Sequence, residues 1–179
     1  MERYFEPFLA FLVPEAHADI DWRRGFEFLD REFEQIMREA AVGDRRADKL
    51  ARVWRKGGDQ ASVFIHVEVE ARKRENFAER MHVYNYRTYD RHRRPVVSLA
   101  VLADGTSGWQ PDRWEYSLWG CHVGIRFPVV ELLDYNEHWE ELEASANPFA
   151  VVIMTHLKAM ATRRSPQKRF RWKLALVKW

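Results

Sequence analysis

Cysteine and long hydrophobic runs are what this sequence has least of. Cys121 is the only cysteine among 179 residues, which excludes an internal disulfide framework and a zinc site built from several cysteines. No apolar run approaches the roughly 18 residues that cross a membrane, and Glu2 and Glu6 stand where a signal peptide carries basic residues. We therefore expect no membrane span and no secretory signal, and a location in the cytoplasm, which is a reducing compartment.

A strong net charge is also missing. The chain has 29 Lys and Arg against 27 Asp and Glu, and its formal net charge of +2 does not by itself indicate binding to nucleic acid. The two signs are separated along the chain, however. Residues 1–43 carry 5 basic and 10 acidic side chains, whereas residues 71–94 carry 8 basic and 3 acidic ones. Apolar residues make up 46% of the chain, which is enough for the packed core of one domain.

Residues 61–70 give the clearest signal of secondary structure in the chain. Apolar and other residues alternate there with a strict period of two, which is typical of a β-strand. The alternation predicts one face made of Val63, Ile65, Val67 and Val69 and an opposite face made of Phe64, His66, Glu68 and Glu70.

The segments around this strand predict an α/β fold with a central mixed β-sheet flanked by helices. The chain up to about Val42 has the apolar spacing of a helix, and residues 46–54 form a strand that pairs with 61–70 as an antiparallel hairpin. A helix at 75–90 crosses over to an apolar strand at 96–103, which makes the second pair parallel. Further strands are expected at 114–119 and 123–127, and helices at 137–145 and 148–162 with Asn147 as an N-cap.

Asp48, Glu68 and Glu70 are the side chains best placed to carry chemistry. Glu68 and Glu70 are two residues apart on one strand face, with Cα atoms about 6.6 Å apart. Strands of a hairpin lie about 4.8 Å apart, so Asp48 can converge with Glu68 if its side chain shares that face. Clustered carboxylates suit a hard cation such as Mg²⁺, which can activate water and hold charge on a phosphodiester oxygen.

A second interpretation of the acidic strand needs no metal. Any half-exposed antiparallel strand alternates in this way, with its polar residues facing the solvent. Two carboxylates two residues apart repel each other, and a nearby base such as Arg52 or Lys49 would be enough to compensate them. Both interpretations remain open from the residues alone.

Basic residues crowd the segment that follows the acidic strand. Arginine dominates there, its planar guanidinium suits bidentate contact with phosphate, and tyrosines are interleaved. The alternative is a solvated helix face, and Arg80 and Arg87 are close enough in sequence to the acidic strand to pair with its carboxylates. The residues that we assign to nucleic-acid binding are Arg72, Arg74, Arg80, Arg87, Arg91, Arg93 and Arg94.

Seven short stretches of the chain have a shared order and spacing, namely 20–22, 46–50, 66–70, 77–81, 84–87, 95–99 and 142–150. Taken together they resemble the Rpn/YhgA-like transposase family, or recombination-promoting nucleases, of the PD-(D/E)XK nuclease superfamily. The resemblance covers most of the chain.

The resemblance implies a restriction-endonuclease-like core in residues 1–162. Residues 163–179 would begin a C-terminal helical extension that continues in a longer protein. Asp48 and Glu68 would bind Mg²⁺ or Mn²⁺, and Glu32 of the first helix would assist as a metal ligand. Glu70 would complete the catalytic set with Asp48 and Glu68, although it occupies the slot where the superfamily usually has Lys and this family Gln.

The resulting expectation is a metal-dependent DNA endonuclease related to mobile elements. The alternative is a nuclease-like domain that has lost cleavage and acts in nucleic-acid binding or protein interaction. Glu70 is the residue that distinguishes these two hypotheses. A third carboxylate with no lysine nearby either strengthens metal binding or makes the site inactive. DNA is the expected partner, and the oligomeric state stays open, a homodimer included.

Overall fold

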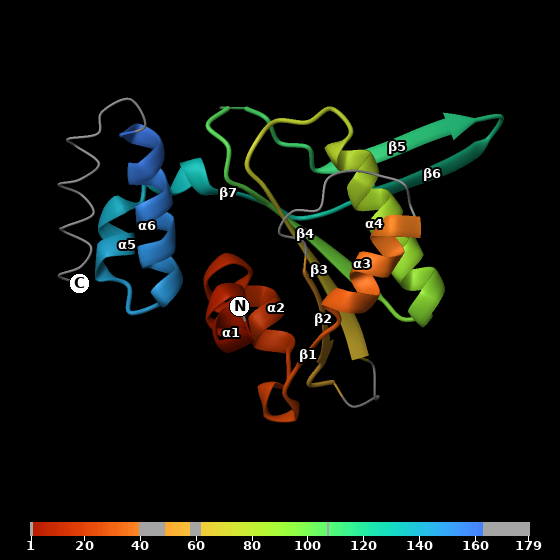
Figure 1. Ribbon diagram of the computed structural model, residues 1–179, viewed down its shortest axis with the longest axis horizontal. Coiled ribbons are helices and arrows are strands. Elements are labelled where there is room, and N and C mark those ends of the chain that lie inside the picture. The colour runs from red at the N-terminus through yellow and green to blue at the C-terminus, as the bar shows by residue number, and fades with distance from the viewer. Residues whose placement is uncertain (1, 40–48, 58–61, 107, 163–179) are drawn as a thin grey trace.

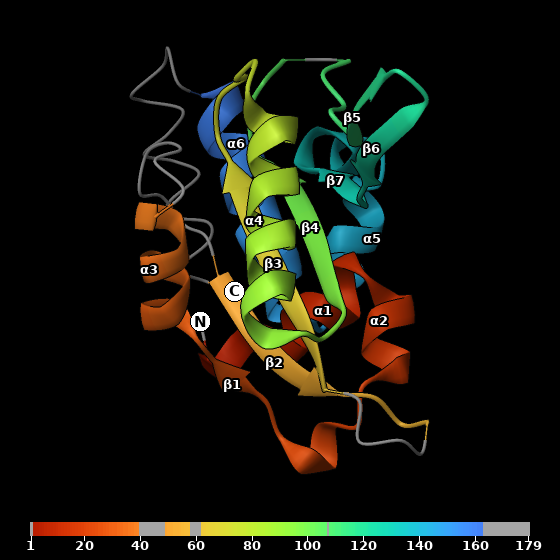
Figure 2. The ribbon, with the colours of Figure 1, turned by 90° about the vertical axis from the view of Figure 1, so that its right-hand side faces the viewer.

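A five-stranded mixed sheet forms the centre of the structure, and helices lie against both of its faces (Figures 1 and 2). The computed structural model describes residues 2–39, 49–57, 62–106 and 108–162. Within them the elements in chain order are η1 (Glu2–Tyr4), α1 (Phe5–Leu12), α2 (Pro14–Asp19), η2 (Trp22–Arg24), β1 (Glu27–Phe28), α3 (Asp30–Glu39), β2 (Lys49–Trp54), β3 (Ser62–Glu70), α4 (Phe77–His92), β4 (Val96–Leu102), β5 (Arg113–Leu118), β6 (Cys121–Arg126), β7 (Val129–Glu131), η3 (Leu132–Asn136), α5 (Trp139–Ala144) and α6 (Pro148–Ala161).

The strands of the central sheet are ordered β1-β2-β3-β4-β7. β1 and β2 are antiparallel, as are β2 and β3, whereas β4 is parallel to both β3 and β7. α4 connects the parallel strands β3 and β4 and packs on them (Figure 2). The predicted hairpin, the predicted crossover and the mixed α/β class are therefore confirmed.

β3 is buried on both of its faces, and it divides the core in two. On one face Val67 lies in an apolar cluster with Phe5 of α1 and Ile153 of α6. On the other face Phe64 packs with side chains of α3 and α4, among them Tyr84. The predicted alternation is confirmed, but the interpretation of the polar face as half-exposed is wrong, because α3 and α4 cover it.

The N-terminal segment is not the single helix that the sequence predicts up to Val42. Pro14 begins α2 directly after α1, since a proline lacks the N–H that would continue the first helix. Gly25, with φ of 72°, ends η2 and leads into the two-residue strand β1. Phe26 and Phe28 pack against Phe5, which satisfies their apolar character without a helix. The end of the predicted helix, residues 40–42, lies outside the described residues.

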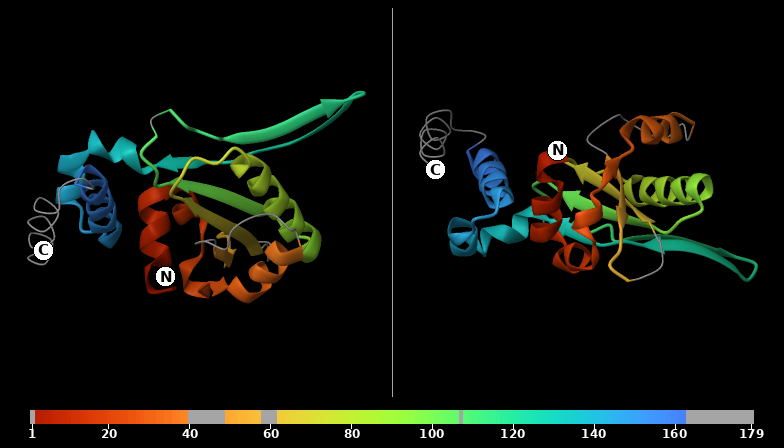
Figure 3. Two further views of the ribbon diagram at one scale, coloured as in Figure 1. Left: turned by 45° about the horizontal axis from the view of Figure 1, so that its top comes forward. Right: turned by 90° about the horizontal axis from the view of Figure 1, so that it is seen from below.

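β5 and β6 form a two-stranded antiparallel arm that extends away from the central sheet (Figures 1 and 3). Both strands are predicted by the sequence, which does not indicate their separation from the main sheet. After the arm, Phe127 is buried and Val129 begins β7, which returns the chain to the edge of β4. This three-residue strand is too short to show a period, so the sequence does not predict it.

Asn147 starts α6 as predicted. Its Oδ1 accepts a hydrogen bond from the backbone N of Phe149 at 2.9 Å, and its Nδ2 donates to the carbonyl of Pro7 at 2.9 Å, which ties α6 to α1. The predicted helical extension at 163–179 lies outside the described residues. Among the helices that are described, none is both long enough and apolar enough to cross a membrane.

Candidate functional site

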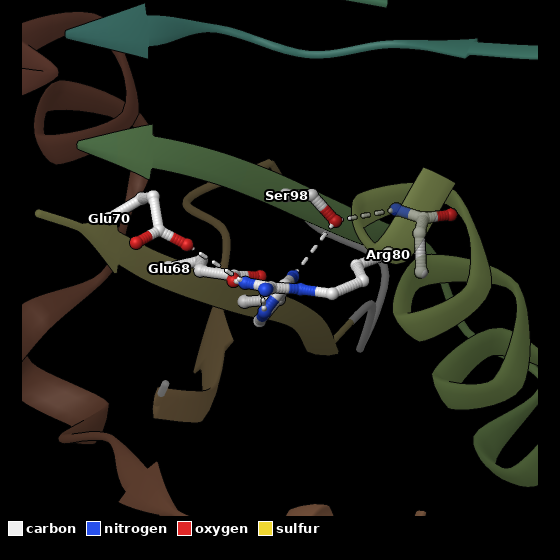
Figure 4. Close-up of polar contacts among 6 residues, drawn as sticks. Glu68, Glu70, Arg80 and Ser98 are labelled. Atoms are coloured by element: carbon white, nitrogen blue, oxygen red, sulfur yellow. Dashed lines mark hydrogen bonds and ion pairs between the residues drawn. The ribbon is translucent and has the colours of Figure 1, made fainter. Parts of the chain in front are cut away.

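Two carboxylates lie on the face of β3 that α4 covers. Glu68 is within the strand and Glu70 is its last residue, so their side chains lie on the same side of the sheet (Figure 4). The exposed fraction is 1% for Glu68 and 8% for Glu70. Glu68 pairs in register with Ala100 of β4, which is fully buried in a cluster with Phe77 and Met81 of α4. Two buried carboxylates this close together require a positive charge nearby.

Arg80 supplies this charge from the start of α4. Its side chain is buried, with an exposed fraction of 4% for the residue. Its Nη2 forms an ion pair with Oε1 of Glu68 and lies 3.3 Å from Oε2 of Glu70 (Figure 4). Phe77, one helical turn earlier, places its ring centre 5.7 Å from the guanidinium carbon. One guanidinium therefore bridges both carboxylates, and the expectation that Arg80 pairs with the acidic strand is confirmed.

Glu70 has two further partners in the loop between β3 and α4. The Nε of Arg74 lies 3.3 Å from its Oε2, and the backbone N of Arg72 donates to its Oε1 at 3.3 Å. Arg74 and Arg80 together match the two negative charges of the carboxylates. The site is thus balanced in charge by groups of the chain itself.

The bases that the sequence offers as compensation are engaged elsewhere. Lys49 forms an ion pair with Asp30 at the start of α3, and Arg52 forms one with Glu27 of β1. Both interactions pin the N-terminal elements to β2. The interpretation that either base compensates the acidic strand is therefore wrong, because the compensating charge comes from Arg80 of α4.

His66 belongs to the same buried network. Its Nδ1 lies 3.3 Å from Oγ of Ser98 on β4, and that hydroxyl accepts a hydrogen bond from Nδ2 of Asn85 on α4 at 3.1 Å (Figure 4). Asn85 also donates to the carbonyl of Val96 at 3.0 Å. Burial lowers the pKa of His66 from its usual 6.5 to about 3, and the charge of Arg80 acts in the same direction. The ring is therefore neutral at pH 7.

One oxygen of Glu68 has no hydrogen-bond partner. Its Oε2 is buried and lies 3.9 Å from Nε2 of His66, which has no hydrogen-bond partner either. An orphaned carboxylate oxygen is a suitable ligand for a hard cation such as Mg²⁺. Among the described residues, however, no group of three or more His, Cys, Asp or Glu side chains is able to hold a metal ion.

Of the other two predicted ligands, Asp48 and Glu32, only Glu32 is among the described residues. Asp48 lies outside the described residues, and β2 is described from Lys49 onward. Glu32 lies on α3, where its carboxylate is 3.6 Å from Nε2 of His92 and is nearly half-exposed. His92 is twelve residues after Arg80 on α4, about 18 Å along the helix. The structure therefore brings Glu32 to the opposite end of α4 from the two buried carboxylates.

The remaining predicted arginines lie around α4 rather than in its buried face. Arg72, Arg91, Arg93 and Arg94 are exposed, and Arg87 is half-buried. Arg93 pairs with Asp90 at 2.7 Å, and Arg91 contacts Gln35 of α3 at 3.5 Å. Exposed basic groups therefore lie at both ends of this helix.

Ser98 and Asn85 are the site residues that sequence reasoning missed. Ser98 carried a usable signal, because it is the one hydroxyl within the apolar run of the predicted strand at 96–103. A buried hydroxyl in such a strand requires a hydrogen-bond partner. Asn85 had no comparable signal, since an amide on an amphipathic helix is more often exposed.

Comparison of the chain with protein-family models, with curated protein sequences and with solved structures finds no significant match in any of the three.

Proposed function

We propose that this chain is a metal-dependent nuclease whose chemistry takes place at the carboxyl end of β3. The observation that carries the proposal is the buried pair of Glu68 and Glu70, in which one oxygen of Glu68 has no hydrogen-bond partner. A fold gains nothing in stability from burying such a pair, so a functional reason for it is favoured. The basic segment 71–94 and the family resemblance support DNA as the substrate.

In this proposal Glu68 binds Mg²⁺ or Mn²⁺ together with Asp48, and the ion would polarise the phosphodiester and activate water. Arg80 is a positioning residue, because it fixes the carboxylates of Glu68 and Glu70 relative to each other. Glu70 lies at the end of the strand and is the more accessible of the pair, which suits it to accept the proton of the attacking water. Arg72, exposed in the following loop, would contact the substrate phosphate.

Incubation of the protein with plasmid DNA and Mg²⁺ or Mn²⁺ tests the proposal. We expect nicking or linearisation that is lost in EDTA and in Glu68→Gln, which keeps the size of the side chain but removes the anionic ligand. The same change at the exposed Glu140 of α5 is the matched control and should leave cleavage unaltered. Cleavage that continues undiminished in EDTA would contradict the proposal.

A second candidate is a nuclease-like domain that binds nucleic acid or protein without cleaving. The pairing of Arg80 with both carboxylates favours it, because the site is already balanced in charge without a metal. Isothermal titration with Mn²⁺ distinguishes the two. Heat of binding that disappears in Glu68→Gln supports the nuclease, and its absence from a folded, non-cleaving protein supports the second candidate.

A further inference from the structure

A band of aromatic side chains runs from the outer side of α4 onto the β5–β6 arm. The three members on the helix are spaced by four and three residues and therefore share one side of it. That side is turned away from the sheet, since Tyr86 and Tyr89 are 59% and 47% exposed. The aromatic band consists of His82, Tyr86 and Tyr89 on α4 and Trp114, Tyr116 and Trp119 on the arm.

Trp114 joins the two parts of the aromatic band. Its ring is stacked on His82, with centroids 4.4 Å apart and an interplanar angle of 23°, and it meets Tyr116 edge-on at 5.4 Å. Trp114, Tyr116 and Leu118 are alternate residues of β5 and therefore lie on one face of the arm. Tyr116 and Leu118 are 49% and 56% exposed, so this apolar face is uncovered beyond its base.

Trp119 occupies the tip of the arm and is 96% exposed. Its φ is 51°, and Gly120 follows with φ of 83°, so both residues of the turn are in the left-handed region. Asn-Gly is the favoured pair in such a turn, and a bulky side chain at the first position is strained. Burial of the Trp119 side chain does not offset this strain, because the side chain is almost fully exposed. An exposed, strained aromatic residue of this kind is typical of a contact with a partner.

The charges around the aromatic band favour an anionic partner. Arg72 and Lys73 are exposed just before α4, and Arg93 and Arg94 are exposed at its end. The glutamates of α5 lie on the opposite side of the molecule from the arm (Figure 1). The α4 part of the aromatic band therefore lies between two groups of exposed basic side chains, in a segment, 71–94, with 8 basic and 3 acidic residues.

We propose that the aromatic band binds a single-stranded segment of nucleic acid by stacking on its bases, while the exposed arginines at the ends of α4 contact its phosphates. Exposed aromatic rings beside basic groups are the usual means of holding unpaired bases. Paired bases hide these faces in the stack, which is why a single strand is favoured over a duplex. The path measures about 10 Å along α4 and about 13 Å along β5, enough for several nucleotides.

This inference rests on the proposed function in taking nucleic acid as the ligand, and it does not require cleavage. Binding is therefore measured in EDTA, by the fluorescence anisotropy of labelled oligothymidylate and of a blunt duplex of equal length. We expect Trp119→Ala and Tyr86→Ala each to weaken oligothymidylate binding by about fivefold to a hundredfold. Trp119→Phe should retain most of the affinity. Tyr4→Ala is the matched control, because Tyr4 is 47% exposed outside the aromatic band, and it should bind as the wild type does.

Unchanged oligothymidylate affinity in Trp119→Ala and Tyr86→Ala overturns the inference. So does a chain that sediments as a dimer and becomes a monomer in Trp119→Ala without loss of affinity, because the band would then contact a second copy. The two proposals fail separately. Plasmid cleavage without oligothymidylate binding would exclude the aromatic band as a binding surface and leave the nuclease proposal standing. Oligothymidylate binding in EDTA without any metal-dependent cleavage would support the band as a binding surface and exclude the nuclease activity.

Discussion

The two faces of β3 are buried to the same degree and are held by different forces. Ile65 and Val67, 5% and 0% exposed, pack among apolar side chains of the N- and C-terminal helices. His66 and Glu68, 0% and 1% exposed, alternate with them in sequence and contact Tyr84 and Arg80 of α4. The apolar face is stabilised by the area that it removes from water, whereas the polar face is stable only while its charges are matched.

The difference shows where a fold accommodates chemistry. A methyl group lost from the apolar face changes stability by a small increment, because neighbouring side chains relax into part of the space. A charge lost from the polar face leaves its partner uncompensated in a region of low dielectric. The site therefore depends on one residue, Arg80, more than on any residue of the apolar core.

The largest effect is expected for Arg80→Met. This change keeps much of the side-chain volume but leaves Glu68 and Glu70 without their shared cation. We expect a loss of about 3–5 kcal/mol in the free energy of unfolding, because a buried ion pair that loses one partner retains the desolvation cost of the other. Urea denaturation followed by circular dichroism measures it.

A double variant separates charge from packing at this position. Arg80→Met alone leaves the buried carboxylate of Glu68 without a cation. Adding Glu68→Gln removes that negative charge, so much of the lost stability should return. Equal stability of the single and double variants would mean that Arg80 contributes through its contacts with Phe77 and not through charge.

Ile65→Ala probes the opposite face and should cost about 2–4 kcal/mol. The loss arises from the apolar atoms removed and from the space that they leave beside Leu9 of α1 and Ala16 of α2, so it should be the same at pH 7 and pH 5. The same urea titrations at the two pH values measure it. A loss that depends on pH would show that the two faces are coupled and would break the comparison.

His66 gives the polar face a pH dependence that the apolar face lacks. Its pKa is about 3 in the folded chain and 6.5 when unfolded, so below pH 6.5 the unfolded chain binds a proton that the folded one excludes. The resulting stability is complete above pH 6.5 and is lost as the pH falls toward 3, by up to about 1.4 kcal/mol per pH unit. His66→Gln should remove this part of the slope, as urea titrations from pH 7 to pH 4.5 would show.

His138 on the surface provides the matched control for that measurement. Its hydrogen bond with Glu141 raises its pKa, so its contribution has the opposite sign, present at low pH and lost as the pH rises. His138→Gln should therefore leave the loss of stability on acidification at least as steep as in the wild type. A slope that is equal in His66→Gln and the wild type contradicts the account of the buried network.

The sequence predicted the fold wherever a local pattern determined it. The period of two in β3 and the apolar run of β4 are visible in the letters, and a helix between two strands implies a parallel crossover. The sequence did not predict that the N-terminal segment is divided into several elements. The positions of Phe26 and Leu29 are compatible with one continuous helix, and they are equally compatible with a short strand followed by α3. The sequence did not predict the arm as a separate unit, because the residue pattern of β5 does not determine which strand it pairs with.

The site was predicted less completely than the fold, and for a physical reason. Glu68 and Glu70 are conspicuous because carboxylates are rare in strands, but their burial depends on how α4 packs on the sheet. Arg80 was grouped with six other arginines, and its spacing from Glu70 across a loop does not fix the direction of its side chain. Only the packing of Phe77 and Met81 against the sheet turns Arg80 inward.

The smallest effect is expected at the edge of the polar network, where Ser98→Ala removes the hydroxyl between His66 and Asn85. Asn85 keeps its hydrogen bond to the carbonyl of Val96, so the loss should be limited to about 1 kcal/mol, measured by urea denaturation at pH 7. Ser117→Ala on the arm is the matched change, because Oγ of Ser117 makes the same kind of contact with His122 at 2.9 Å, but exposed to solvent. Water replaces the lost partner there, and we expect almost no change. Equal losses in the two variants would show that the hydroxyl of Ser98 contributes no more in the buried network than it would at the surface.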